Sequence, residues 1–150
     1  GIPITLFTYE KMRSSVRFLW RSIWNPFRRL TMKLVIASDI HGSAAWCQRM
    51  LEVYETEGCT ALVLLGDILY HGPRNDLPRD YAPKQVIPML SAYQDIIVAV
   101  RGNCEAEVDQ MVLEFPILAD YCLLTVGNRL IYATHGHNYN LQKLPPLQHL

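Results

Sequence analysis

The chain has 150 residues, half of them apolar, so it is long enough for one globular domain with a sizeable core. Its formal net charge is zero, but residues 1–31 hold six of the 14 basic side chains and one acidic side chain, which leaves the remainder acidic. An acidic body excludes a uniformly basic nucleic-acid binder, so no nucleic-acid partner is expected, and it suits a cation site instead.

Residues 1–31 differ in character from the rest of the chain. They mix arginines with large aromatic residues and show neither strand alternation nor a capped helix, and the aromatic residues are Trp20, Trp24 and Phe27. An interfacial amphipathic helix, an Arg-rich targeting segment and a stretch foreign to the natural protein are all open interpretations. The last is favoured, because the chain begins with Gly1 and Met32 directly precedes the first predicted strand. We expect an extraneous, disordered or amphipathic extension over 1–31 and a domain over 32–150.

Short apolar runs along this domain predict strands that are buried on both faces, and these runs are residues 34–38, 61–65 and 96–100. Between the first two runs, apolar side chains recur at helical spacing over residues 44–57. Ser43 is the predicted N-cap of this helix and Gly58 ends it.

The second half of the domain continues the alternation of helices and strands. A helix is predicted from residue 83 to about residue 93, with a kink or break at Pro88. A short helix follows around residues 108–111, and residues 121–126 and 129–134 are typical of a β-hairpin. This order predicts a mainly parallel α/β sheet with helices on both faces, which binds ligands beyond the carboxyl ends of its strands.

Candidate metal ligands follow four of the predicted strands, and they are Asp39, His41, Asp67, Asn103 and His135. Carboxylate, amide and imidazole donors suit manganese, iron or zinc, and fit poorly with a structural zinc site built on cysteines. Two ions about 3.5 to 4 Å apart could share the whole set through a bridging carboxylate, an arrangement used for in-line displacement at phosphorus. The predicted bridge is Asp67. One Asp after a strand is more often a helix cap than a ligand, but five such residues at successive strand ends are hard to explain as caps.

Glycines stand beside these candidate ligands, at positions 42, 66, 102 and 136. Glycine is suited to sharp backbone turns and to the close approach of a substrate oxygen. The four cysteines are widely spaced, form no CxxC pair and are Cys47, Cys59, Cys104 and Cys122. They predict free thiols in a reducing compartment, so we expect the cytoplasm. No apolar run approaches the roughly 20 residues that a membrane-spanning helix needs, so no membrane partner is expected for 32–150.

Four short motifs occur in this order along the chain: DIHG at 39–42, GD at 66–67, GNC at 102–104 and HGH at 135–137. Together they resemble the calcineurin-like metallophosphoesterases. HGPRN at 71–75 and AVRGNCEAEVDQM at 99–111 resemble the YfcE type of bacterial phosphodiesterase within that superfamily. The resemblance covers residue 32 to about residue 147. It implies a β-sandwich flanked by helices, and hydrolysis of phosphodiesters by a hydroxide that bridges two divalent metal ions.

The resemblance also implies a role for each candidate ligand. Asp39 and His41 would bind the first ion, and Asp67 would bridge both ions. Asn103 and His135 would bind the second ion. Manganese is the expected metal, with Zn²⁺, Fe²⁺ and Ni²⁺ as alternatives. A small phosphodiester is the expected substrate, and a homo-oligomer is a possible assembly.

The implied catalytic set comprises Asp67, Asn103, His135 and Cys104. Related phosphatases of the wider superfamily place a histidine at the position of Cys104, where it assists the leaving group. A thiol is a poorer general acid at neutral pH, which favours activated esters as substrates. His137 is a neighbour of the site and could contact substrate or only orient His135. Arg74 could bind a phosphate oxygen, or it could be a solvated surface arginine.

Members of the family carry a further GHTH motif about 20 residues beyond HGH, which supplies one ligand to each metal. The sequence of this chain ends before such a motif, and His149 lacks the flanking glycine and threonine. Residues 32–150 are therefore expected to be the N-terminal portion of the domain, with impaired activity. The alternative function is a catalytically inactive scaffold with the same fold that binds other proteins.

Overall fold

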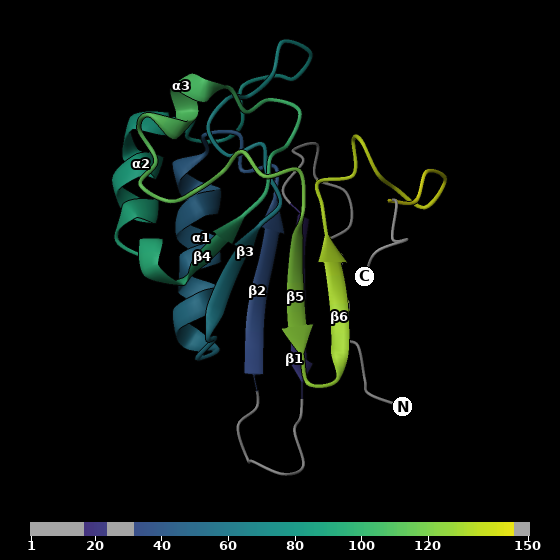
Figure 1. Ribbon diagram of the computed structural model, residues 1–150. Helices are drawn as coiled ribbons and strands as arrows, with labels where there is room; N and C mark the ends of the chain where they lie inside the picture. The colour runs from purple at the N-terminus through teal and green to yellow at the C-terminus, as the bar shows by residue number, and fades with distance from the viewer. Residues whose placement is uncertain (1–16, 24–31, 146–150) are drawn as a thin grey trace.

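The computed structural model describes residues 17–23 and 32–145 and places a four-stranded sheet at their centre (Figure 1). The strands lie in the order β1-β2-β3-β4, and their bounds are Arg17–Ile23, Met32–Ser38, Ala61–Leu64 and Ile97–Ala99. Strands β2, β3 and β4 run parallel to one another, and β1 is antiparallel to β2. The three predicted parallel strands are thus confirmed.

Strand β1 comes from the basic, aromatic N-terminal stretch. It pairs with β2 along its whole length, from Arg17 opposite Ser38 to Ile23 opposite Met32. The interpretation of this stretch as an amphipathic helix is therefore wrong for residues 17–23, because the free edge of β2 offers backbone partners that sequence periodicity does not reveal. Trp24 and Phe27 lie outside the described residues, and a domain boundary at residue 32 stays a prediction.

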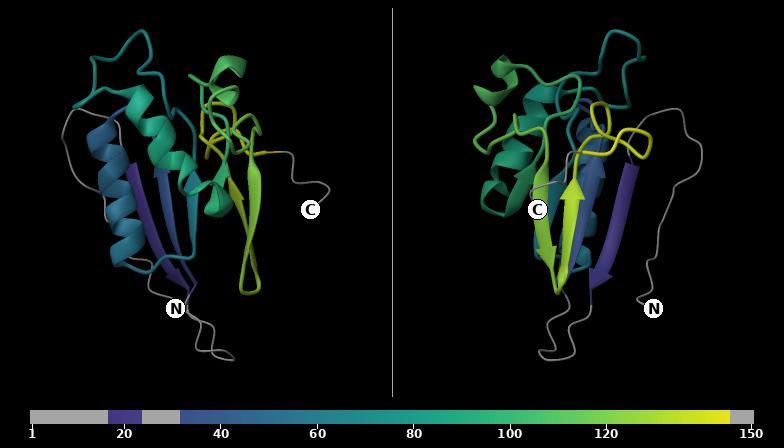
Figure 2. Two further views of the ribbon diagram at one scale, coloured as in Figure 1. Left: turned by 90° about the vertical axis from the view of Figure 1, so that its left-hand side faces the viewer. Right: turned by 45° about the vertical axis from the view of Figure 1, so that its right-hand side comes forward.

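Two long helices cover one face of the sheet (Figure 2). Helix α1 (Ala44–Thr56) begins at the predicted cap, where the Ser43 hydroxyl accepts a hydrogen bond from the Trp46 backbone N–H at 3.3 Å. This bond satisfies one of the N–H groups that a helix leaves free at its start. Helix α1 is therefore confirmed as predicted.

Helix α2 (Pro83–Ser91) carries Pro83 in its first turn, where the missing N–H costs no hydrogen bond, and Pro88 lies inside it. A 3-10 helix, η1 (Gln94–Ile96), leads directly into β4. Helix α3 (Glu107–Gln110) is short and confirms the predicted helix in this region. Within the described ranges, no helix combines the length and the apolar composition that crossing a bilayer requires.

The opposite face of the sheet is covered by the predicted hairpin, β5 (Cys122–Val126) and β6 (Arg129–Ala133) (Figure 2). The prediction of helices on both faces is therefore wrong. The reason is the alternation of side chains along β2. Leu34 and Ile36 pack in one cluster with Val126 of the hairpin, and Val35 and Ala37 pack in another cluster with α1 and α2. The result is a β-sandwich with helices on its outer side, and the expected fold class is confirmed.

Candidate metal centre

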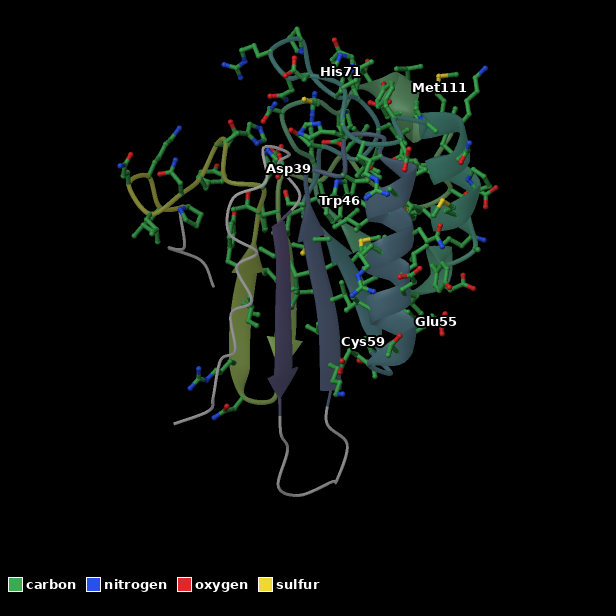
Figure 3. The ribbon with its side chains drawn as sticks, turned by 180° about the vertical axis from the view of Figure 1, so that it is seen from behind. Asp39, Trp46, Glu55, Cys59, His71 and Met111 are labelled. Carbon is green, nitrogen blue, oxygen red and sulfur yellow. The ribbon has the colours of Figure 1, made fainter. Side chains whose placement is uncertain are left out.

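The predicted ligands lie on four loops that follow strands at one end of the sandwich. Asp39 and His41 follow β2, Asp67 follows β3, Asn103 follows β4 and His135 follows β6. Strands β2, β3 and β4 are parallel, so their carboxyl ends share one edge of the sheet, and β6 ends on the same side (Figure 1). Figure 3 shows Asp39 at this end of the sheet, with His71 of the next loop beyond it.

Three of these residues have a left-handed backbone conformation. The φ angle is 61° at Asp39, 49° at His41 and 54° at Asp67, and Asp80 at 50° is the only other described non-glycine residue with a positive φ. Such conformations cost about 1–3 kcal/mol each and persist only where the surrounding structure imposes them. Here the Asp39 N–H donates to the Gly66 carbonyl at 3.0 Å, and the His41 N–H donates to the Asp67 carbonyl at 2.8 Å. Backbone strain is thus concentrated on the predicted ligands.

Two of the predicted glycines allow the loops to meet. Gly66 has a φ of 94°, and a side chain on it would overlap the backbone of Gly102. A side chain on Gly102 would overlap the carboxylate of Asp67. The loops after β3 and β4 can therefore approach closely only because both positions are glycine.

His41 is buried and its imidazole has a defined orientation. Its Nδ1 lies 2.7 Å from the Tyr70 carbonyl oxygen, which assigns the proton to Nδ1. The other nitrogen, Nε2, lies 3.4 Å from Asp39 Oδ1 and 3.7 Å from Asp67 Oδ2. The hydrogen bond with Asp39 raises the pKa of His41 above its ordinary value, against the opposing effect of burial. The arrangement directs the ring nitrogen that can bind a metal toward two carboxylates.

Asp39 lies beside His41 and is tied to the preceding residue. The Ser38 hydroxyl donates a hydrogen bond to Asp39 Oδ2 at 2.6 Å. Burial acts to raise the pKa of Asp39, but hydrogen bonds with His41 and Ser38 outweigh it, so the pKa lies below its ordinary value. Asp39 is therefore held as a carboxylate, the form that binds a cation.

Asp67 occupies the middle of the site and is only 2% exposed. Its Oδ1 accepts a hydrogen bond from the Cys104 backbone N–H at 2.8 Å. Its Oδ2 lies 3.7 Å from Nε2 of His41 and 3.7 Å from Nε2 of His135. One oxygen is thus fixed by the protein, and the other faces both imidazoles.

His135 and Asn103 form the other side of the site. Nδ1 of His135 lies 2.7 Å from the Leu65 carbonyl oxygen, so Nδ1 carries the proton, and its Nε2 lies 3.0 Å from Asn103 Oδ1. Asn103 is exposed, whereas His135 is half-buried. An amide oxygen and an imidazole nitrogen thus converge on one point, next to Asp67.

The donor atoms fall into two groups that share Asp67. One group joins Asp39, Asp67 and His135, the other joins His41, Asp67 and Cys104, and in each group the donor atoms lie within 4.8 Å of one another. These groups bring together four of the predicted ligands, and Asn103 joins them because its Oδ1 lies 3.0 Å from His135 Nε2. The oxygen and nitrogen donors of the five residues fit a divalent cation. Their assignment as metal ligands stays a prediction.

The three other predicted site residues differ in their surroundings. The ring of His137 contacts the ring of His135, with centroids 5.3 Å apart, but His137 is exposed. Arg74 is exposed on the loop after β3. Cys104 is half-buried, and burial together with the nearby Asp67 carboxylate raises the pKa of its thiol to about 12. Cys104 is therefore a neutral thiol at the site rather than a thiolate.

Comparison with known proteins identifies the family of this chain. Residues 32–147 match the family model of the calcineurin-like phosphoesterase superfamily domain. The chain belongs to the calcineurin-like phosphoesterase superfamily. It is 47% identical over 116 residues to phosphodiesterase YfcE of Escherichia coli K12, and equally to phosphodiesterase YfcE of E. coli O157:H7. These alignments cover 77% of this chain and 63% of each relative's length.

A solved structure of a related protein has the same fold. It is described as YfcE, a phosphoesterase from E. coli, and it matches with a TM-score of 0.74 at 47% sequence identity. The match covers 76% of this chain and 63% of that chain. The fold class and the family that the four motifs indicate are both confirmed.

Two further residues support the site of this calcineurin-like chain and are absent from the sequence-based set. Ser38 is buried, and besides its bond to Asp39 its hydroxyl lies 3.5 Å from Nδ1 of His135. Glu105 is buried and binds backbone N–H groups of the loops after β3 and β4. The available signal was position alone, since Ser38 ends the first apolar run and Glu105 directly follows GNC.

Proposed function

We propose that this chain is a metal-dependent phosphodiesterase that binds two divalent ions and hydrolyses small phosphodiesters by in-line displacement. The observation that supports it most is the position of Asp67, whose free carboxylate oxygen lies 3.7 Å from both His41 and His135. A carboxylate oxygen placed between two imidazoles is suited to bridge two cations. Membership of a phosphoesterase superfamily and 47% identity to a protein named a phosphodiesterase support the same reaction.

The donors are assigned to the two ions as the family resemblance implies, and the nearest donor atoms are 3.4 Å apart in the pair Asp39–His41 and 3.0 Å apart in the pair Asn103–His135. Asp39 and His41 would hold the first ion, Asn103 and His135 would hold the second, and Asp67 would contact both. The mixture of carboxylate, imidazole and amide donors suits Mn²⁺, with Zn²⁺, Fe²⁺ and Ni²⁺ as alternatives. Each ion would take three of these side chains, fewer than the six positions of an octahedral site. We therefore expect weak metal binding and impaired turnover from these donors alone.

The chain's own residues would orient the metal donors and the reaction. Bound ions of this kind supply an activated water and polarise the phosphoryl oxygens. The carbonyl oxygens of Tyr70 and Leu65 hold the Nδ1 protons of His41 and His135, which leaves both Nε2 lone pairs directed into the site. The Ser38 hydroxyl donates a hydrogen bond to the Asp39 carboxylate, and the Cys104 backbone N–H donates one to the Asp67 carboxylate. These bonds fix the orientation of both carboxylates.

The substrate preference follows from Cys104. Cys104 directly follows Asn103, and its position is the one from which the leaving group of the substrate would be protonated. The pKa of its thiol is raised to about 12. Such a weak acid protonates a departing alkoxide poorly, so esters with good leaving groups are the proposed substrates. Arg74 and His137 remain proposed substrate contacts, and both are exposed on loops at this end of the molecule.

Hydrolysis of bis(4-nitrophenyl) phosphate with added Mn²⁺ tests the proposal. Asp67→Asn keeps the size of the side chain and an oxygen for the Cys104 N–H, but removes the charge that the ions need. We expect it to abolish turnover, whereas Asp95→Asn, which changes an exposed carboxylate of η1, should leave turnover unchanged. No hydrolysis by a wild-type chain saturated with Mn²⁺, or equal rates with Asp67→Asn, would instead favour the inactive scaffold.

A further inference from the structure

Glu105 is a buried carboxylate beneath the candidate metal centre. It is 5% exposed, and it belongs to neither group of candidate donor atoms. A buried carboxylate is costly unless hydrogen bonds or a cation compensate its charge. The neighbouring Arg101 donates to the backbone carbonyl of Glu105, at 3.3 Å, and not to its carboxylate. The charge of the Glu105 carboxylate is therefore stabilised by groups other than Arg101.

Three backbone N–H groups converge on this carboxylate. Oε2 accepts from the Asp67 N–H at 2.9 Å and from the Gly102 N–H at 2.6 Å. Oε1 accepts from the Ile68 N–H at 2.7 Å. Hydrogen bonds to an ionised acceptor are the strong kind, so this set is well suited to hold backbone in place.

The three bonds connect two loops that carry different ligands. Asp67 and Ile68 belong to the loop after β3, and Gly102 precedes Asn103 on the loop after β4. A single oxygen, Oε2, binds one N–H from each loop, which sets the distance between the backbones of Asp67 and Asn103. The Asp67 N–H bond also helps to hold that residue at its positive φ of 54°.

We infer that Glu105 is a positioning residue that sets the metal affinity of the site by holding Asp67 and Asn103 at a fixed separation. This inference rests on the proposed function, since it concerns the same two ions. Glu105 acts through backbone N–H groups and is not one of the candidate donors. Its loss therefore changes where the donors stand and leaves their chemical nature unchanged.

Three variants test this role. Glu105→Gln keeps the size of the side chain but presents an amide N–H to a backbone N–H, so at least one bond is lost. Glu105→Asp keeps the charge on a shorter side chain. The control is Gln110→Ala, because Gln110 also makes three bonds to backbone, to Leu113, Phe115 and Ile117, away from the metal centre.

The measurements are Mn²⁺ affinity by titration calorimetry, the electron paramagnetic resonance spectrum of bound Mn²⁺, and the thermal midpoint. Outer partners of metal ligands typically change affinity by about 10- to 100-fold, and we expect a loss of this size for Glu105→Gln. Glu105→Asp should have an intermediate affinity and regain the wild-type spectrum in part. Gln110→Ala should lower the thermal midpoint while it leaves affinity and spectrum unchanged.

Two results would overturn the inference. One is an Mn²⁺ affinity of Glu105→Gln within about twofold of the wild type. The other is an equal loss of affinity in Gln110→Ala at a matched fall in thermal midpoint, which would assign the effect to general stability. If Glu105→Gln does not fold, the same comparison is made with Glu105→Asp. Wild-type chain that binds Mn²⁺ but hydrolyses no diester would refute the proposed function and leave the role of Glu105 standing.

Discussion

The layer between the sheet and helices α1 and α2, and the carboxyl end of the same sheet, both contain buried side chains, but the two sets differ in kind. Between the sheet and helices α1 and α2 the buried side chains are apolar, and Leu62, Met50 and Leu90 are fully enclosed. Where burial is described, the buried polar and charged side chains are all on the loops at the carboxyl end or at the strand end beside them: Ser38, His41, Ser43, Asp67 and Glu105.

This difference separates stability from function. Apolar burial on regular strands and helices stabilises the fold at no cost in backbone strain. At the carboxyl end, positive φ angles and buried charges cost free energy, and hydrogen bonds from side chains to backbone offset that cost. Substitutions in the interior should therefore change the free energy of unfolding, and substitutions at the carboxyl end should change metal binding.

The largest effect is expected from Leu62→Ala in the interior. Leu62 is 0% exposed on β3, so truncation leaves a cavity between the sheet and the helices. Loss of a buried leucine costs about 2–5 kcal/mol, and urea unfolding should show a decrease in this range. The matched control is Leu130→Ala on strand β6. Leu130 is 53% exposed, so its truncation should change stability little. An equal decrease in both would contradict the location of the core.

Asp39→Asn should produce the opposite pattern. The amide keeps an oxygen for the Ser38 hydroxyl but lacks the charge that binds a cation. We expect Mn²⁺ affinity to fall by about 100-fold or more, equivalent to about 2.7 kcal/mol, because a direct ligand should matter at least as much as its outer partners. Calorimetric titration measures this, and the unfolding midpoint in urea without metal should stay close to that of the wild type. An unchanged affinity would remove Asp39 from the ligand set.

Mn²⁺ itself should stabilise the wild-type chain. A ligand that binds only the folded state at 100 times its dissociation constant adds about 2.7 kcal/mol, and chelation should reverse this. Thermal unfolding with and without the metal measures the shift. The shift should be smaller in Asp39→Asn and unaltered in Leu62→Ala. Metal-independent unfolding of the wild type would count against a metal centre at this end of the sheet.

The smallest effect is expected at the other end of β2. Lys33 forms a partly exposed ion pair with Glu57, with 3.3 Å between Nζ and Oε2, and its ammonium also donates to the Glu57 backbone carbonyl at 2.9 Å. Exposed pairs contribute about 0–1 kcal/mol, so Lys33→Ala should lower stability by about 0.5 kcal/mol or less. Mn²⁺ affinity should not change, because the pair lies at the far end of the strand from the candidate metal centre. A measurable loss of affinity would show that the two regions are coupled.

Several elements could be predicted because their causes are local. Helix α1 needs only a capping serine and apolar residues at helical spacing, and both are visible between Ser43 and Gly58. The hairpin needs only a Gly-Asn turn between two apolar runs, and Gly127 in this turn has a positive φ of 62°. The five candidate ligands could be found because each directly follows an apolar run or stands beside a glycine.

Other elements depend on partners distant in the sequence. Strand β1 forms against the free edge of β2, and nothing in its own mixture of arginine and aromatic residues predicts this. The second face of the sheet is covered by a hairpin rather than by helices, because Val126 and Ile131 match the apolar side chains that β2 and β3 present there. Which segment pairs with the edge of β2, and which segment covers the second face of the sheet, is therefore decided by tertiary packing.

The amino-acid sequence by itself determined the chemistry of the site, since the order of motifs specifies which donors follow which strands. Only the tertiary structure decided the arrangement of those donors. It directs one oxygen of Asp67 toward two histidines, and it joins the loops after β3 and β4 through Glu105, 38 residues from Asp67. Hydrogen bonds between a side chain and a distant backbone leave no periodic pattern in a sequence, so their partners become visible only once the chain is folded.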